Sequence, residues 1–355
     1  MHYKLLGPTG LRVSELCLGT MTFGEEWGWG ASVEECRKLF NAYLDHGGNF
    51  IDTANYYTNG SSENIVGELS QGIRDQLVIA TKYTLNLNPE KNANGGGNHR
   101  KNMMRSVEQS LRRLRTDYID LYWIHIWDKV TPVEEIMRGL DDLVSSGKVL
   151  YTGFSDAPAW VVAKGNTLAE NHGWNKFAAL QLEYNLIERG IERELLPLAR
   201  HDDLAVLAWS PLSMGLLSGK YRSASDKGQS GRGEFIDHRL TERNIRIIDT
   251  LVAVAAEIGA SPAAIALRWL QYQYHQVIPI LGARKLDQLL DNLTSVNYEL
   301  TPEQLHRLNE ASKMEMGFPY DFFSSQEQVH DVWSRVNGVF KADVLSEAER
   351  RAVRR

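Results

Sequence analysis

The chain has 355 residues, of which 43% are hydrophobic and 24% charged, a globular composition that excludes the disordered and fibrous classes. Its formal net charge of -6 disfavours nucleic-acid binding, because nucleic-acid-binding proteins usually carry a basic excess. Cys17 and Cys36 have no metal-ligand spacing, so we expect neither a disulfide framework nor a metal site. No apolar run approaches roughly 18 residues and no secretory leader is visible, so we expect a cytoplasmic protein without membrane spans.

Short apolar runs alternate with longer amphipathic segments along nearly the whole chain. Several runs are continuously apolar, which is typical of parallel strands covered on both faces. The expected strands are 15–21, 50–54, 77–82, 119–125, 149–155, 177–184, 205–210 and 277–281.

Helical patterns follow these strands, as at 33–46 and 102–114, where apolar side chains share one helical face. Thr131-Pro132 and Ser261-Pro262 each predict an N-cap followed by proline at the first helical position. Repeated strand-then-helix units predict a closed (β/α)8 TIM barrel. A doubly wound open sheet is the alternative, but the segment 19–24 after the first strand lacks its G-x-G-x-x-G fingerprint.

We expect a single domain over residues 1–355, made of a hairpin that plugs the barrel bottom, the barrel itself and a C-terminal extension. Three long loops each follow a strand, so they should lie on the C-terminal rim, where barrel active sites form. The expected parts are the hairpin 1–14, the barrel 15–313, the extension 314–355, and the loops 22–32, 84–99 and 213–240.

Four polar residues lie at or just beyond strand ends. Asp52, Lys82 and His125 end three successive strands, and Tyr57 follows Asp52 by five residues. Each could be merely structural, as a turn residue, a rim aromatic, a solvated lysine or a core histidine. Because neighbouring strand ends of a closed barrel converge on one mouth, the four groups together predict a proton-transfer site.

The chemistry of such a set is definite. A free tyrosine titrates near pKa 10, so it is a poor acid at neutral pH unless its phenolate is stabilised. A lysine ammonium about 4 Å away would supply on the order of 4 kcal/mol, and although burial opposes it, we expect a net lowering of the pKa of Tyr57 by about one to three units. Asp52 would keep Lys82 charged, and His125 would orient a carbonyl oxygen by a hydrogen bond.

These residues carry a resemblance to a known family. FIDTANYY at 50–57, ATK at 80–82 and DLYWIH at 120–125 are similar to the three catalytic segments of the aldo-keto reductases. Further segments resemble the family's later strands in the same order along the chain. These are YTGFSD at 151–156, QLEYN at 181–185, AWSPL at 208–212 and ILGARK at 280–285.

The resemblance implies reversible, NADPH-dependent reduction of an aldehyde or ketone, with Asp52, Tyr57, Lys82 and His125 as a catalytic tetrad. It also implies a binding site for NADPH or NADP+ with three parts: carboxamide contacts, a ring-stacking tryptophan, and contacts to the pyrophosphate and adenosine. The implied cofactor residues are Gly19, Thr20, Met21, Asp52, Ser155, Asp156, Gln181, Trp209, Ser210, Pro211, Leu212, Gly215, Lys220, Gly282, Arg284, Gln288, Asp291 and Asn292.

One residue departs from the family pattern. Asp156 stands where the family usually has asparagine, which both donates and accepts hydrogen bonds. An ionised aspartate only accepts. We therefore expect Asp156 either to bind the amide nitrogen of a carboxamide alone or to make no such contact.

An aromatic substrate pocket is expected at the mouth, lined by Trp27, Trp29, Tyr57, Tyr83, His125 and Trp127. Aryl aldehydes, sugars, polyketide-like ketones and fungal-toxin carbonyls all remain open as its small-molecule substrate, and so does the oligomeric state. The loop 84–99, with glycines at 95–97, predicts a mobile lid, although a surface segment is the alternative.

A second function remains open on the same fold. Potassium-channel beta subunits resemble reductases and bind NADPH, so a regulatory cofactor-binding subunit is the alternative to an enzyme. The chain begins almost directly at the hairpin, without the N-terminal inactivating segment often found in such subunits, which favours the enzyme.

Overall fold

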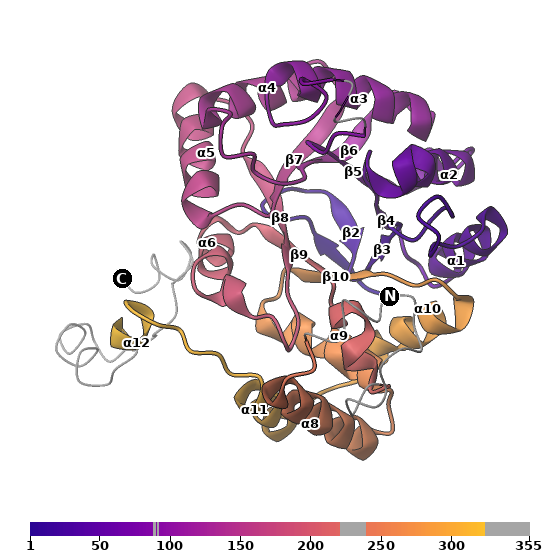
Figure 1. Ribbon diagram of the computed structural model, residues 1–355, viewed down its shortest axis with the longest axis vertical. Coiled ribbons are helices and arrows are strands. Elements are labelled where there is room, and N and C mark those ends of the chain that lie inside the picture. The colour runs from indigo at the N-terminus through magenta and orange to yellow at the C-terminus, as the bar shows by residue number, and fades with distance from the viewer. Residues whose placement is uncertain (88–89, 91, 221–238, 324–355) are drawn as a thin grey trace.

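The computed structural model describes residues 1–323, apart from 88, 89, 91 and 221–238. Eight parallel strands close into a barrel surrounded by helices (Figure 1), which confirms the predicted TIM barrel. Each expected apolar run coincides with one strand. In barrel order the strands are β10 (Val277–Leu281), β3 (Cys17–Gly19), β4 (Phe50–Asp52), β5 (Val78–Tyr83), β6 (Ile119–Ile124), β7 (Val149–Ser155), β8 (Phe177–Glu183) and β9 (Ala205–Trp209), and β9 pairs with β10 to close the ring.

The helices cover the outside of the barrel with their apolar faces inward (Figure 1). The longer helices are α1 (Val33–Asp45), α2 (Ser61–Leu69), α3 (Arg100–Leu114), α4 (Val133–Ser145), α5 (Ala159–His172), α6 (Leu195–Asp202), α8 (Glu242–Ile258), α9 (Pro262–Gln273), α10 (Leu286–Leu293) and α11 (Pro302–Ala311). Short helical segments are η1 (Tyr57–Gly60), η2 (Arg74–Gln76), η3 (Gly190–Glu192), η4 (Ser213–Ser218), η6 (Thr294–Asn297) and α12 (Tyr320–Phe323). Most of the expected loop 213–240 and of the extension 314–355 lies outside the described residues.

The two proline-based helix starts had different outcomes. Ser261 caps α9 as predicted, because its Oγ accepts a hydrogen bond from the backbone N–H of Ala264 at 3.1 Å. The predicted cap at Thr131 is wrong, since α4 begins one residue later and Pro132 occupies the cap position. The Thr131 hydroxyl instead donates to Asp128 Oδ2 at 2.6 Å and helps to fix the loop after β6.

The N-terminal hairpin closes the bottom of the barrel. β1 (Tyr3–Leu5) and β2 (Arg12–Ser14) pair antiparallel, and Leu6 and Val13 are fully buried among side chains of the barrel interior. The turn at Gly7 has φ 56°, and a Cβ there would lie 2.1 Å from the carbonyl oxygen of Ala178. Only glycine fits this approach, and the expected plug is confirmed.

The apolar side chains of the strands form two separate cores, one inside the barrel and one under the helices. Side chains that point inward form the barrel interior, including Phe50, Ala80 and Trp123, while outward ones pack under the helices. Because side chains alternate along a strand, Lys82 points into the barrel and Tyr83 points out toward the helices.

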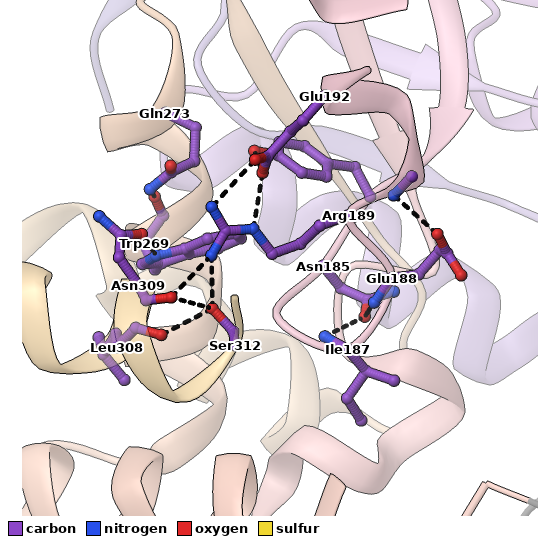
Figure 2. A network of polar contacts seen from close by, with 12 residues as sticks. Asn185, Ile187, Glu188, Arg189, Glu192, Trp269, Gln273, Leu308, Asn309 and Ser312 are labelled. Atoms are coloured by element: carbon purple, nitrogen blue, oxygen red, sulfur yellow. Dashed lines mark hydrogen bonds and ion pairs between the residues drawn. The ribbon is translucent and has the colours of Figure 1, made fainter. Parts of the chain in front are cut away.

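A polar network ties the loop after β8 to the C-terminal end of α11 (Figure 2). Arg189 forms a two-point ion pair with Glu192, at 2.7 and 3.0 Å, and lies over the ring of Trp269 at 5.2 Å. The same guanidinium donates to the carbonyl of Asn309 at 3.1 Å and to the hydroxyl of Ser312 at 2.7 Å. The network therefore fixes the loop that leaves β8 at the barrel mouth.

The described part of the chain has neither a single membrane-spanning helix nor a cluster of metal-binding side chains. No single helix there is long and apolar enough to cross a membrane, although α8 and α9, bent by 98° at their junction, reach that measure when taken together. Within the same residues, no group of three His, Cys, Asp or Glu side chains could hold a metal ion. Both cysteines are buried and unpaired.

Candidate active site

The strand ends bring the four predicted catalytic groups together at the barrel mouth. Lys82 Nζ forms an ion pair with Asp52 and donates to the carbonyl of Thr53 at 2.9 Å and to the hydroxyl of Tyr57 at 3.1 Å. The Lys82 and Asp52 side chains are 0% and 2% exposed. The ammonium is therefore fixed by three oxygens, one of which is the phenol.

Tyr57 is held by a loop of unusual backbone geometry. Thr58 and Asn59 follow it with φ 45° and 56°, in the left-handed region that non-glycine residues rarely adopt. The Thr58 hydroxyl donates to the carbonyl of Phe23 at 2.6 Å and accepts from the backbone of Ser62 at 3.0 Å. The hydroxyl of Ser62 in turn lies 2.8 Å from those of Thr20 and Thr53.

The sequence does not predict this hydroxyl cluster, because no local pattern joins Thr20 to a hydroxyl 42 residues later. It joins the ends of β3 and β4 to the loop of Tyr57. Thr20 belongs to it: its hydroxyl donates to the carbonyl of Asp52 at 3.0 Å, so the side chain is buried and points away from the mouth. The structure thus gives the Thr20 side chain a supporting contact, and its expected cofactor contact stays a prediction.

The expected lowering of the pKa of Tyr57 is wrong for the protein groups described. Burial raises this pKa above its ordinary value, Lys82 lowers it, and Asp52 raises it again, with a net upward shift. Burial is the largest of these effects, and together with Asp52 it outweighs the effect of Lys82 on the pKa of Tyr57. For Lys82, burial opposes the charge but Asp52 and Tyr57 outweigh it, so the pKa of Lys82 is raised and the ammonium stays charged.

His125 follows β6 and faces Tyr57 edge-on, with ring centroids 5.9 Å apart. Burial and the nearby Lys82 charge lower the pKa of His125 to about 3, so the imidazole is neutral at physiological pH. Its Nδ1 is buried without a hydrogen-bond partner. A neutral ring with no acceptor at Nδ1 favours the proton on Nε2, which makes Nε2 the donor.

Four of the expected nicotinamide contacts lie on neighbouring strand ends. Ser155 ends β7, and Gln181 of β8 donates to Asp52 Oδ1 at 2.8 Å. Trp209 ends β9 and donates its indole N–H to Asp156 Oδ1 at 3.1 Å. The Asp156 carboxyl is solvent-accessible but crowded by protein, and this desolvation raises its pKa to about 6.

The segment after β9 is a tight loop of left-handed residues. Ser210, Ser213, Met214 and Gly215 all have positive φ, at 50°, 47°, 57° and 101°. The backbone N–H groups of Ser213 and Met214 donate to the carbonyl and the hydroxyl of Ser210, at 2.8 and 3.2 Å, so the loop is held by its own hydrogen bonds. Pro211 and Leu212 lie within this loop, Asn185 donates to the Ser210 carbonyl at 3.0 Å, and exposed Lys220 ends the described segment.

The expected adenosine contacts follow β10. The Arg284 guanidinium makes a 3.5 Å hydrogen bond to the carbonyl of Trp29, and no described carboxylate lies within ion-pair distance of it. Gln288 accepts from the Arg284 backbone at 3.2 Å, and Asn292 is buried on the same helix, α10. Asp291 accepts from Ser261 at 2.8 Å, which ties it to the start of α9.

These residues fit a nicotinamide dinucleotide phosphate. The set matches the molecule at two ends: polar groups beside a tryptophan for the nicotinamide, and a guanidinium without a described carboxylate partner for a further phosphate. The expected contact of the loop after β9 with the pyrophosphate stays a prediction. Met21 is exposed beside β3, Gly282 is exposed after β10, and Gly19 is buried where a Cβ would lie 2.6 Å from Ile280 Cγ2.

Tyr57 packs against His125 and against one of the tryptophans expected in the pocket. Trp27 packs on Trp29 at 5.5 Å, on Tyr56 at 5.8 Å and edge-on to Tyr57 at 6.5 Å. Trp127, two residues after His125, packs edge-on to Trp160 at 5.3 Å. Neither Tyr56 nor Trp160 was predicted for the pocket.

The prediction that Tyr83 lines the pocket is wrong. Its ring is fully buried under the helices, stacks on Tyr122 at 5.3 Å and donates to the carbonyl of Asn98 at 3.2 Å. The alternation along β5 could have excluded it, because a neighbour of inward-pointing Lys82 must point outward.

Comparisons with known proteins agree with this geometry. Residues 15–313 match the model of the Aldo/keto reductase family. A norsolorinic acid reductase of Emericella nidulans is 41% identical, covering 92% of this chain and 86% of the relative. An aryl-alcohol dehydrogenase [NADP(+)] of Phanerodontia chrysosporium is 39% identical, with 91% and 88% covered, and a putative aryl-alcohol dehydrogenase of Saccharomyces cerevisiae is 39% identical, with 87% and 86% covered.

Proposed function

Because this chain belongs to the aldo/keto reductase family and is therefore an oxidoreductase acting on carbonyl groups, we propose that it uses NADPH to reduce an aromatic aldehyde or ketone. The observation that carries the proposal is the contact chain Asp52–Lys82–Tyr57 beside neutral His125 at the barrel mouth. This set supplies one proton and one hydrogen-bond donor at a single point.

The nicotinamide, when bound, supplies the hydride that reduces the carbonyl carbon. Tyr57 gives its proton to the carbonyl oxygen, and the Lys82 ammonium stabilises the phenolate left behind. Asp52 keeps Lys82 charged and in place. His125 Nε2 donates a hydrogen bond to the same carbonyl oxygen and so fixes its orientation.

The raised pKa of Tyr57 suits this role. A general acid must hold its proton before the reaction, and burial keeps Tyr57 protonated at neutral pH. The charge of Lys82, 3.1 Å from the phenol oxygen, acts on the anion that forms during proton transfer. The lysine therefore favours the step itself rather than ionising the resting phenol.

Two features favour an aromatic substrate and NADPH. Trp27, Trp29 and Tyr56 offer ring faces and edges beside Tyr57, against which an aromatic substrate packs better than a sugar. Arg284, without a described carboxylate partner, is available to the 2′-phosphate that distinguishes NADPH from NADH. The names of the relatives, an aryl-alcohol dehydrogenase [NADP(+)] among them, agree with both.

A carbonyl panel tests the proposal. The parent enzyme is assayed with benzaldehyde, acetophenone and glyceraldehyde, each with NADPH and NADH, by loss of nicotinamide absorbance. We expect turnover of the aryl carbonyls with NADPH, and its loss in Tyr57→Phe, which keeps the ring and should bind NADPH as the parent does. Tight NADPH binding without turnover of any carbonyl would favour the regulatory alternative.

A further inference from the structure

We propose that Trp127 and Trp160 form a second aromatic subsite, which holds the outer ring of an extended, multi-ring carbonyl substrate. The inference rests on the proposed function and specifies its substrate class. Trp160 lies in the first turn of α5, which follows β7, and Trp127 lies in the loop after β6. Since β6 and β7 are neighbours in the barrel, both indoles belong to the same side of the mouth.

Exposure singles out Trp160. Its side chain is 56% exposed, although its ring meets Trp127 edge-on at 5.3 Å. A large aromatic that is half in water beside an active site is an apolar surface available for a ligand. Trp160 therefore offers exposed ring surface at the start of the helix that follows β7.

The spacing sets which substrate reaches it. Trp127 is two residues from His125, so their Cα atoms are at most about 7 Å apart. Trp160 stands one ring contact farther out. We therefore expect a single ring with its carbonyl at Tyr57 and His125 to fall short of Trp160, and a larger fused ring system to reach it.

The subsite is built before any ligand binds. The backbone N–H of Trp127 donates to the carbonyl of Asp156, and the next residue, Asp128, accepts from the backbones of Asn98, Val130 and Thr131 at 2.7, 3.0 and 2.9 Å. The loop is thus tied to the loops after β5 and β7. Because this loop is already ordered, binding a flat, rigid ligand costs little further conformational entropy, which favours affinity.

A series of aldehydes tests the subsite. Benzaldehyde, 2-naphthaldehyde and anthracene-2-carbaldehyde share the reacting group and differ only in the number of fused rings. Trp160→Ala should lower kcat/KM for the anthracene aldehyde about tenfold, chiefly through KM, and leave benzaldehyde within about twofold of the parent. Trp160→Phe should restore most of the loss, because it restores a ring.

The matched control is Tyr3→Ala, which removes an exposed aromatic side chain at the opposite, hairpin end of the barrel. It should leave kcat/KM unchanged for all three aldehydes. Equal effects of Trp160→Ala on all three aldehydes, or none, would overturn the subsite. A change in molecular mass by light scattering without a selective loss would assign Trp160 to an interface between copies of the chain, and would overturn it as well. A parent that reduces none of the aldehydes would instead refute the proposed function.

Discussion

The buried ion pair of Lys82 and Asp52 allows stability and catalysis to be separated. In Lys82→Met the carboxylate of Asp52 stays buried and keeps only the Gln181 amide as a described side-chain donor. Removing one partner of a buried pair costs about 3–5 kcal/mol, because the other charge is left uncompensated. We therefore expect Lys82→Met to lower the free energy of unfolding by about that amount.

The double variant Asp52→Asn/Lys82→Met should recover most of this loss, because no buried charge remains and the asparagine oxygen can still accept from Gln181. Activity should not recover. Without the ammonium, the phenolate of Tyr57 has no stabilising charge, and reduction of benzaldehyde should fall by about 10²–10⁴-fold in both variants.

Unfolding is followed by tryptophan fluorescence in urea, and turnover by nicotinamide absorbance. Lys82→Met should bind NADPH within a few-fold of the parent, which would show that the mouth is intact. A double variant as unstable as the single one would refute the stability argument. A single variant that reduces benzaldehyde within a few-fold of the parent would refute the role of Lys82.

Three further predictions concern other parts of the molecule. Arg284→Ala should weaken the binding of NADPH by about 1.5–3 kcal/mol and barely affect the binding of NADH, as measured by nicotinamide fluorescence. Equal losses for the two cofactors would show that Arg284 supports the fold instead. As pH rises through about 6, Asp156 ionises and should favour the cationic ring of NADP+, so the ratio of Kd for NADP+ to Kd for NADPH should fall about two- to fivefold. The 2′-phosphate cancels in that ratio, and a parent curve as flat as that of Asp156→Asn would contradict the assignment. Arg189→Ala should lower the free energy of unfolding in urea by about 2–3 kcal/mol. The control Arg37→Ala, which breaks an exposed pair with Glu68, should lower it by under about 1 kcal/mol. Similar losses in the two variants would show that the network adds little stability.

The barrel was predictable because it depends on patterns that repeat along the chain. Every strand is a short apolar run bounded by polar residues, and the charged tetrad residues interrupt those runs at their ends. Asp52, Lys82 and His125 could be placed at one mouth because parallel strands align their ends. The alternation of side chains along β5 also excludes Tyr83 from the pocket, because Tyr83 follows the inward-pointing Lys82 and must point outward.

The sequence could not fix the contacts that depend on loops. The hydroxyl cluster around Ser62 joins residues more than 40 positions apart, and no local pattern announces it. Trp160 is separated from Trp127 by the whole of α4 and β7, so only the closed barrel brings their rings together. The balance that raises the pKa of Tyr57 likewise depends on burial, which a strand pattern does not measure.

The loop 84–99 shows how the structure changes an expectation. Its glycines predicted a mobile lid, but in the part described the backbone is well anchored. The N–H of Gly97 donates to the carbonyl of Thr84 at 2.8 Å, and Arg105 donates to the carbonyl of Gly95 at 2.8 Å. Asn98 is fully buried and exchanges hydrogen bonds with Asp128 at 2.7 Å in both directions.

Asn98 also donates to the carbonyl of Ile126, the residue after His125, at 2.9 Å. Deleting 92–97 would pull Asn98 away and release the loop that positions both His125 and Trp127. We therefore expect the deletion to lower kcat/KM for benzaldehyde and for anthracene-2-carbaldehyde alike, because both need His125. The matched control is Asn94→Ala, which truncates an exposed side chain of the same loop and keeps the loop's length, so its effect should be smaller. A deletion that impairs only the anthracene aldehyde, with benzaldehyde unchanged, would restore the lid and refute the supporting role.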